Sequence, residues 1–310
     1  MKYCVSIYLL LLCLSCRPGS EASSISGMTS DKTQYPPGYY MDDALPDRIA
    51  YLTFDDGPTD WTREILDTLK KSNIKATFFI CAHWMPKSPG HDNSFKKYKP
   101  VLERMIYEGH TIGNHTASHI NLTKLSSAEI ADQLDLNQTL LNQELGTIAP
   151  TMTLIRTPYG APWYSMSNSS NRRRVADIVR TRGLVMMWSR HFNSGDSAEW
   201  VKGDWYEEGK KTNINEAEFK EKMKRIYNNL IQNANGRGMV VLFHDTHLTT
   251  AKILPEIIQK LISQGYSFST MEEYVEWRWN TSSREFIRKN LALPDEVRMP
   301  IFEIRDVPNN

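Results

Sequence analysis

Two adjacent carboxylates, Asp55 and Asp56, follow an apolar and β-branched run that begins at Tyr51, and a Gly-Pro turn follows them. This order predicts a buried strand that delivers both carboxylates to the end of a sheet. Neighbouring strand residues point to opposite sides, so one carboxylate can bind a metal while the other acts as a base. The alternative is an ordinary Asp-Asp-Gly-Pro turn that closes a strand.

Two histidines form the second candidate group, because His115 and His119 lie within Gly109-His-Thr-Ile-Gly-Asn-His-Thr-Ala-Ser-His119. Their spacing predicts that they share one face of a helical turn and bind a metal together. Zinc commonly takes two imidazoles and a carboxylate and keeps an open position for water. The alternative is a loop with incidental histidines. His110, on the approach to this stretch, is interpreted as structural.

Two further predicted strand ends and one loop segment carry polar groups. Arg156-Thr-Pro-Tyr-Gly160 combines an arginine that can orient a carboxylate base with a turn that can present a backbone N–H to a developing oxyanion. His244 ends an apolar run and is a candidate general acid, because imidazole titrates near neutrality. Asp196 can accept a hydrogen bond from such a histidine and change its pKa.

From Arg48 onward, strand-like and helix-like segments alternate, which predicts parallel βαβ units, about seven in number. The predicted strands are a short one leading into Gly113-Asn114 together with Ile49–Phe54, Ala76–Ile80, Thr153–Arg156, Leu184–Trp188, Met239–Phe243 and Tyr266–Thr270. The predicted helices are Arg63–Leu69, Pro100–Glu108, Ser126–Gly146, Arg173–Arg182, Glu216–Asn235 and Lys252–Gly265. No dinucleotide-binding fingerprint is present, so a barrel-like closure is favoured, and barrel active sites gather at the carboxyl ends of the strands.

Composition describes an ordinary globular protein: 310 residues, 40% apolar, with a formal charge of +1. The basic runs are short and scattered, which indicates solvated faces and no nucleic-acid partner. Of the four cysteines, only Cys81 belongs to the predicted folded part, so no intrachain disulfide is expected there. Cys81 itself is interpreted as a small buried hydrophobic residue.

The N-terminus has the pattern of an export signal, with Lys2 followed by an apolar run from Val5 to Leu14. Leu14-Ser-Cys16 resembles a bacterial lipoprotein processing site, although Cys13 stands where leucine is usual. We therefore expect a signal peptide over residues 1–16, lipidation at Cys16 and a flexible Ser-, Gly- and Pro-rich tether over residues 17–45. The protein is expected to be exported, either held in the cell envelope by that lipid anchor alone or secreted.

Four motifs occur in one order along the chain: TFDDG, HTASH, RTPYG and LFHD. From about Pro46 to Trp277 the chain resembles the polysaccharide deacetylase family with NodB homology, carbohydrate esterase family 4. The resemblance implies an α/β fold, a distorted (β/α) barrel of about seven strands. It places this domain at residues 46–280, with a C-terminal extension over residues 281–310.

The resemblance also implies a role for each motif residue. Asp55 is the general base, positioned by Arg156, and His244 is the acid that protonates the leaving amine, tuned by Asp196. The divalent metal, usually zinc with Co2+, Ni2+ or Mn2+ as alternatives, is bound by Asp56, His115 and His119. The Tyr159 backbone N–H joins the metal in holding the oxyanion, and Leu242 lines the pocket for the acetyl methyl.

One motif departs from the family. Its usual form is Asp-x-x-Asp-Trp, and here it reads Asn193-Ser-Gly-Asp-Ser197, without the first aspartate and the tryptophan. Trp188 or Trp200 can wall the acetyl pocket instead. Two irregular insertions, Trp84–Lys99 and Asn193–Asn213, are expected to be loops near the site.

The function expected from this resemblance is metal-dependent removal of N-acetyl groups from an envelope or extracellular polysaccharide. Peptidoglycan N-acetylglucosamine is the first expected substrate, and poly-N-acetylglucosamine or a chitin-type polymer is next. Two alternatives remain: an O-acetyl xylan-type esterase, and a non-catalytic glycan-binding lipoprotein on the same fold.

Overall fold

The computed structural model describes residues 39–40, 45–83, 94–164, 169–189, 195–196 and 214–292. The chain divides into two units, Met1–Lys32 and Thr33–Asn310, and all described residues belong to the second. Several predictions fall outside the described residues: the signal peptide, Cys16, the tether up to residue 38, Trp200, most of both insertions and residues 293–310.

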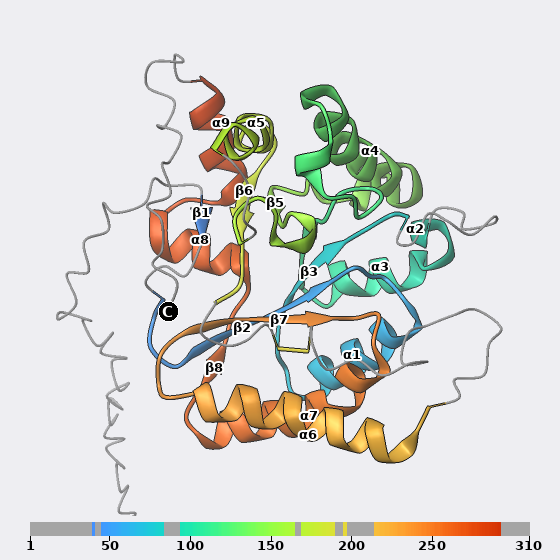
Figure 1. The fold of residues 1–310 in the computed structure, drawn as a ribbon, viewed down its shortest axis with the longest axis vertical. Helices are drawn as coiled ribbons and strands as arrows, with labels where there is room; N and C mark the ends of the chain where they lie inside the picture. Colours follow the sequence, from blue (N-terminus) through green and yellow to red (C-terminus); the bar gives the residue numbers. More distant parts are fainter. Residues whose placement is uncertain are drawn as a thin grey trace, which may run out of the picture. The chain divides into compact units, whose positions relative to one another are not determined.

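One parallel sheet organises this unit, with the strand order β1-β6-β5-β4-β3-β2-β7 and with β8 paired to β2 (Figure 1). It curls into a half-barrel with helices around it, which confirms the predicted α/β barrel. The strands are β1 (Tyr39–Tyr40), β2 (Ile49–Asp55), β3 (Thr77–Ile80), β4 (Thr111–Asn114), β5 (Leu154–Ile155), β6 (Leu184–Met186), β7 (Met239–His244) and β8 (Ser267–Phe268).

The outer face of β2, β3 and β7 is covered by helices. Leu52 and Phe54 alternate with inward-facing residues along β2, and the Phe54 ring stacks on Phe78 and Phe243 with centroids 5.0 and 5.7 Å apart. The helices of this core are α1 (Asp60–Lys71), α2 (Ser94–Lys97), α3 (Lys99–Tyr107), α6 (Glu216–Asn233), α7 (Leu248–Ser263) and the carboxyl-terminal end of α4 (Ser127–Leu145). The outer residues of β5 and β6 pack instead with the amino-terminal half of α4, with α5 (Ser169–Val179) and with the short η1 (Leu122–Lys124).

The interior of the half-barrel has its own apolar cluster, to which Tyr51, Phe79 and Val240 contribute from the strands. Two helices fill its amino end, α8 (Met271–Trp279) and α9 (Ser283–Ala292). The rings of Tyr51 and Tyr274 meet edge to face at 5.7 Å. Helix α9, in the segment predicted as a C-terminal extension, contributes buried side chains to this cluster.

Ser189, in the chain that follows β6, hydrogen-bonds to β7. The Ser189 N–H donates to the Val240 carbonyl at 3.0 Å, and the Val240 N–H donates back to Ser189 Oγ at 3.0 Å. These two bonds join the chain after the carboxyl end of β6 to the amino-terminal part of β7, on opposite sides of the curled sheet.

The structure differs from the predicted elements at several ends. Strand β1 lies within the predicted tether, and α2 lies within the predicted insertion Trp84–Lys99, where Phe95 is buried against the outer core. Helix α7 begins at Leu248, upstream of the predicted Lys252; its first turn buries Thr249 and Thr250, and it contains Pro255 internally. Among the described residues, no helix combines the length and apolar composition that crossing a bilayer requires.

Candidate active site

The predicted site residues meet at the carboxyl edge of the sheet. Asp55 and His244 are register partners on the neighbouring strands β2 and β7. Asn114, which precedes His115, pairs with Ile155, which precedes Arg156. Parallel strands end at the same edge, so polar residues that follow separate apolar runs are brought together there.

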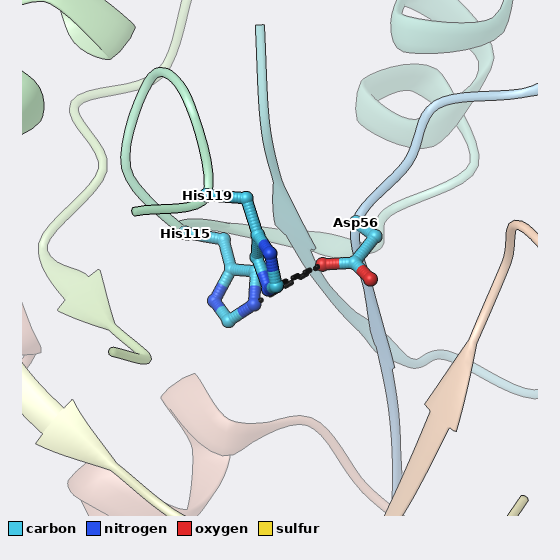
Figure 2. Close-up of side chains that lie close together, drawn as sticks. All are labelled: Asp56, His115 and His119. Carbon is cyan, nitrogen blue, oxygen red and sulfur yellow. Dashed lines mark ion pairs between the residues drawn. The ribbon is translucent and has the colours of Figure 1, made fainter. Parts of the chain in front are cut away.

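Asp56, His115 and His119 form a compact group in which three ligand atoms lie within 4.8 Å of one another. Asp56 Oδ1 is 3.3 Å from His115 Nε2 and 3.2 Å from His119 Nε2 (Figure 2). A tetrahedral zinc with bonds of about 2.0–2.1 Å requires ligand separations of roughly 3.3 Å. Asp56 Oδ1 is also buried without a hydrogen-bond partner. The group therefore fits a divalent cation.

The two histidines do not lie on a helix, so the predicted helical turn is wrong. They come from the loop that follows β4, in which Thr116 and His119 adopt positive φ values of 68° and 48°. This backbone path brings both imidazoles to one side. The His115 Nδ1–H donates to the Arg156 carbonyl at 2.6 Å, which orients the ring and leaves Nε2 facing Asp56.

The electrostatics of the group favour a negative Asp56. Burial raises the pKa of Asp56, but the adjacent His119 and His115 lower it more, to well below the ordinary range. Burial lowers the pKa of His115, but the Asp55 and Asp56 carboxylates raise it more. Burial lowers the pKa of His119, so this imidazole is the readier of the two to stay neutral. A neutral imidazole and an ionised carboxylate are the forms that bind metal.

Asp55 is held from the inside of the half-barrel by a fully buried arginine. Arg156 Nη1 donates to Asp55 Oδ1 at 2.8 Å and to Thr53 Oγ1 at 2.6 Å, and Nε donates to the Met186 carbonyl at 2.8 Å. The guanidinium carbon lies 4.2 Å from the centroid of the Phe79 ring. These contacts fix one carboxylate oxygen of Asp55, while Oδ2 faces His115 Nε2 at 3.7 Å.

His244 is held by Asp196 across the site. The ring Nδ1–H donates to Asp196 Oδ1 at 2.7 Å, and the backbone N–H of His244 donates to Oδ2 at 2.8 Å. The Thr250 hydroxyl also donates to Oδ2. Burial lowers the pKa of His244, but Asp196, with smaller contributions from Asp56 and Asp55, raises it to about 10. Asp196 therefore favours the protonated imidazole.

The other predicted contact residues lie around this edge. Tyr159 has a positive φ of 60°, and its 64% exposed side chain places its ring centroid 4.7 Å from that of His119. Leu242 is buried two residues before His244 and shares its side of β7. Trp188 packs edge to face on Tyr164, with centroids 5.0 Å apart. Their contacts within the described part of the chain assign them no role.

Sequence reasoning missed the residues that hold the site from outside it. Thr53 supports Arg156, Asp245 packs over the turn after Asp56, and Asn114, Gln133 and Asn137 hold the histidine loop. Two of them have a local sequence signal: Asp245 ends the LFHD motif, and Asn137 is a polar residue on the apolar stripe of its helix.

The chain is similar to known deacetylases. A sequence model of the polysaccharide deacetylase family matches residues 42–182, which include Asp55, His115 and Arg156. The peptidoglycan-N-acetylglucosamine deacetylase PgdA of Listeria monocytogenes is 33% identical over 228 residues, 73% of this chain and 38% of that protein. The peptidoglycan-N-acetylmuramic acid deacetylase PdaC of Bacillus subtilis is 30% identical over 230 residues, 74% of this chain and 39% of that protein. The chain thus spans about two fifths of the length of these relatives.

A solved structure agrees with these matches. The Bc1960 peptidoglycan N-acetylglucosamine deacetylase superposes with a TM-score of 0.57 at 28% identity, over 79% of this chain and 94% of that one. Motifs, fold and sequence similarity lead to one conclusion: the chain belongs to the polysaccharide deacetylase family.

Proposed function

We propose that this protein hydrolyses the N-acetyl groups of amino sugars in an envelope or extracellular polysaccharide, with peptidoglycan N-acetylglucosamine as the first substrate. One observation carries the proposal. A carboxylate held by arginine and an imidazole held by a carboxylate flank a three-ligand group that fits a metal at one sheet edge. Amide hydrolysis needs a base for water, an acid for nitrogen and an electrophile for the carbonyl. The named activities of the relatives support the substrate class.

Asp56, His115 and His119 would hold the divalent cation, with zinc the first choice. When bound, such a cation supplies Lewis acidity that polarises an acetamide carbonyl and lowers the pKa of water. The fold brings two imidazole nitrogens together with the carboxylate oxygen Oδ1 of Asp56. That oxygen has no hydrogen-bond partner among the described residues, so it is available to a cation.

Asp55 and His244 would divide the proton transfers. Asp55 takes a proton from the attacking water, and Arg156 keeps its carboxylate oriented. His244 donates its proton to the amide nitrogen as the C–N bond breaks. The products are a free amino sugar and acetate. The Tyr159 N–H would donate to the developing oxyanion, and Leu242 would contact the acetyl methyl.

Asp55→Asn is the sharpest test of the base. An amide cannot accept the water proton, so acetate release should fall at least as far as loss of acid–base catalysis predicts, about 10²–10⁴-fold. Metal content should stay near that of the parent, because Asp55 is not one of the three ligands. Acetate release and metal analysis measure the two quantities. Asp47→Asn, at an exposed position, is the control. Near-normal turnover by Asp55→Asn would refute the assignment.

Substrate class is tested with the parent protein. Acetate release is measured on peptidoglycan, poly-N-acetylglucosamine, chitin oligomers and acetylated xylan, and mass spectrometry of the muropeptides distinguishes deacetylated glucosamine from muramic acid. Release from xylan alone would favour the esterase alternative. Bound metal without turnover on any polymer would favour the glycan-binding alternative.

We also propose that the protein is exported and held at the bacterial envelope through a lipid on Cys16. The support is the sequence: Lys2, the apolar run Val5–Leu14, and a cysteine directly after Leu14-Ser15. Secretion without a lipid is the alternative. An envelope location would bring the site to peptidoglycan.

A further inference from the structure

Helix α4 contacts the backbone between the two histidine ligands through Gln133. The Ala117 N–H donates to the Gln133 carbonyl at 3.0 Å, and the Ser118 N–H donates to Gln133 Oε1 at 2.9 Å. One residue thus accepts from two successive amides of the segment that separates His115 from His119.

One helical turn later, Asn137 is fully buried on the same helix. Its Oδ1 accepts from the Ala82 N–H at 3.0 Å, while Nδ2 donates to the Ile80 carbonyl at 2.8 Å and to Asn114 Oδ1 at 3.0 Å. A buried amide is retained at little cost only when its hydrogen bonds are made, as they are here. The side chain therefore ties the end of β3 to the start of the histidine loop.

Asn114 hydrogen-bonds both to α4 and to the histidine loop. Its Nδ2 donates to the Leu134 carbonyl of α4 at 3.0 Å, and its Oδ1 accepts from the Thr116 N–H at 2.9 Å. Asn114 directly precedes His115, so the backbone on both sides of that ligand is fixed against α4.

The loop needs such support. Thr116 and His119 are L-residues with positive φ, a conformation that persists only where the surroundings hold it. In Figure 2, both imidazoles extend from this loop toward Asp56, so a shift of the loop would change the separation of the two Nε2 atoms.

We propose that Gln133 and Asn137 are positioning residues for the metal group, because they set the backbone path that aims His115 and His119 at one cation. The catalytic value of this positioning rests on the proposed function, but the positioning itself is read out by metal affinity. Partners of this kind typically change metal affinity or activity 10–100-fold when mutated.

The test compares Gln133→Ala, Gln133→Glu and Gln143→Ala in the full chain. Gln133→Ala removes the acceptor of the Ser118 amide, Gln133→Glu keeps a side-chain oxygen there, and Gln143 is an exposed glutamine further along α4. Zinc affinity is measured by competition with a chromophoric chelator, and the visible spectrum of the Co2+-loaded protein reports ligand geometry. Thermal unfolding of the metal-free variants controls for stability.

We expect Gln133→Ala to bind zinc about 10–100-fold more weakly, with an altered Co2+ spectrum and a metal-free Tm near that of the parent. Gln133→Glu should restore affinity and spectrum, and Gln143→Ala should match the parent. If Gln133→Ala lowers the metal-free Tm, Gln133→Met replaces it, because methionine keeps the length and helix preference of the side chain without the acceptor.

Parent-like affinity and an unchanged Co2+ spectrum in the variant that lacks the acceptor would overturn the proposal. That outcome leaves the proposed deacetylation intact. Conversely, a parent protein that binds zinc, loses affinity on Gln133→Ala and releases no acetate would reject the proposed function while supporting the positioning role.

Discussion

The adjacent carboxylates of the first motif are separated by backbone conformation. Asp55 is the last residue of β2 and faces the interior, where Arg156 holds it. Asp56 has a φ of 77°, which takes its side chain out of the strand's alternation and toward the histidines. Gly57 follows because a Cβ there would lie 2.0 Å from Asp245 Oδ2. The first motif thus points the carboxylates of Asp55 and Asp56 in two directions, and its glycine leaves room for the carboxylate of Asp245.

The charge of Asp196 should set the alkaline limit of activity. The pKa of His244 is raised to about 10 in the folded protein, and a general acid loses activity as pH rises through its pKa. Asp196→Asn keeps an oxygen that accepts from the ring N–H but removes the charge that raises the pKa. The alkaline limb of the kcat/KM profile should therefore move to lower pH.

The measurement is acetate release across the pH range, with Asp47→Asn as a charge-matched control at an exposed position. An unmoved alkaline limb in Asp196→Asn would mean that another group sets it. In that case the ionisation of His244 would not be the one that limits activity at alkaline pH.

At the scale of elements, α8 and α9 close the amino end of the interior and support the strands that carry the site. Phe286 of α9 is 8% exposed and packs on the Trp279 ring, with centroids 5.3 Å apart. Phe286→Ala should lower the free energy of unfolding by about 3 kcal/mol, as large-to-small changes in cores do. Urea unfolding measures it.

Phe286→Leu is the matched control and should cost less, because most of the buried volume is kept. A loss below about 0.5 kcal/mol for the alanine variant, the range of surface substitutions, would show that α9 is not part of the cooperative unit.

The sequence predicted the elements and the catalytic edge because both are local signals. Apolar runs that end in Asp55, Arg156 and His244 predict strands, and parallel strands share an edge. The stripe of Ile130 and Leu134 predicts α4. These patterns need no knowledge of which distant residues come into contact.

The rest depends on contacts between segments far apart in the chain. The spacing of His115 and His119 suits a helix, yet the loop is held by α4, which no local rule shows. Likewise, nothing around Ser189 in the sequence indicates that it bonds to β7, because its partner Val240 lies 51 residues further along the chain. Asn137, a polar residue on the apolar stripe of its helix, is a local signal of a buried role.

At the scale of the whole chain, a folded unit that carries the site follows an N-terminal sequence with an export pattern. Cys16→Ser tests whether lipidation in that N-terminal sequence anchors the folded unit to a membrane. In a bacterium that processes lipoproteins, the parent should label with radioactive palmitate and fractionate with membranes, because two acyl signals give stable anchoring. The serine variant should lose the label and leave the membrane fraction.

Cys13→Ser is the control and should remain labelled. Membrane association of Cys16→Ser equal to that of the parent would contradict lipidation at this position. Such a result would leave the proposed chemistry untouched, since every described site residue lies in the folded unit, from Thr53 onward.

Strand β1 has a mechanical consequence for an anchored protein. Because Tyr39 and Tyr40 pair in parallel with Val185 and Met186, the chain enters the sheet from its amino end, opposite the edge that carries Asp56. Tension applied through the N-terminal segment would load the short β1–β6 ladder in shear before any other strand. With two residue pairs against the six of β2–β7, that ladder is expected to separate first in an anchored protein, before the load reaches the strand that carries Asp55.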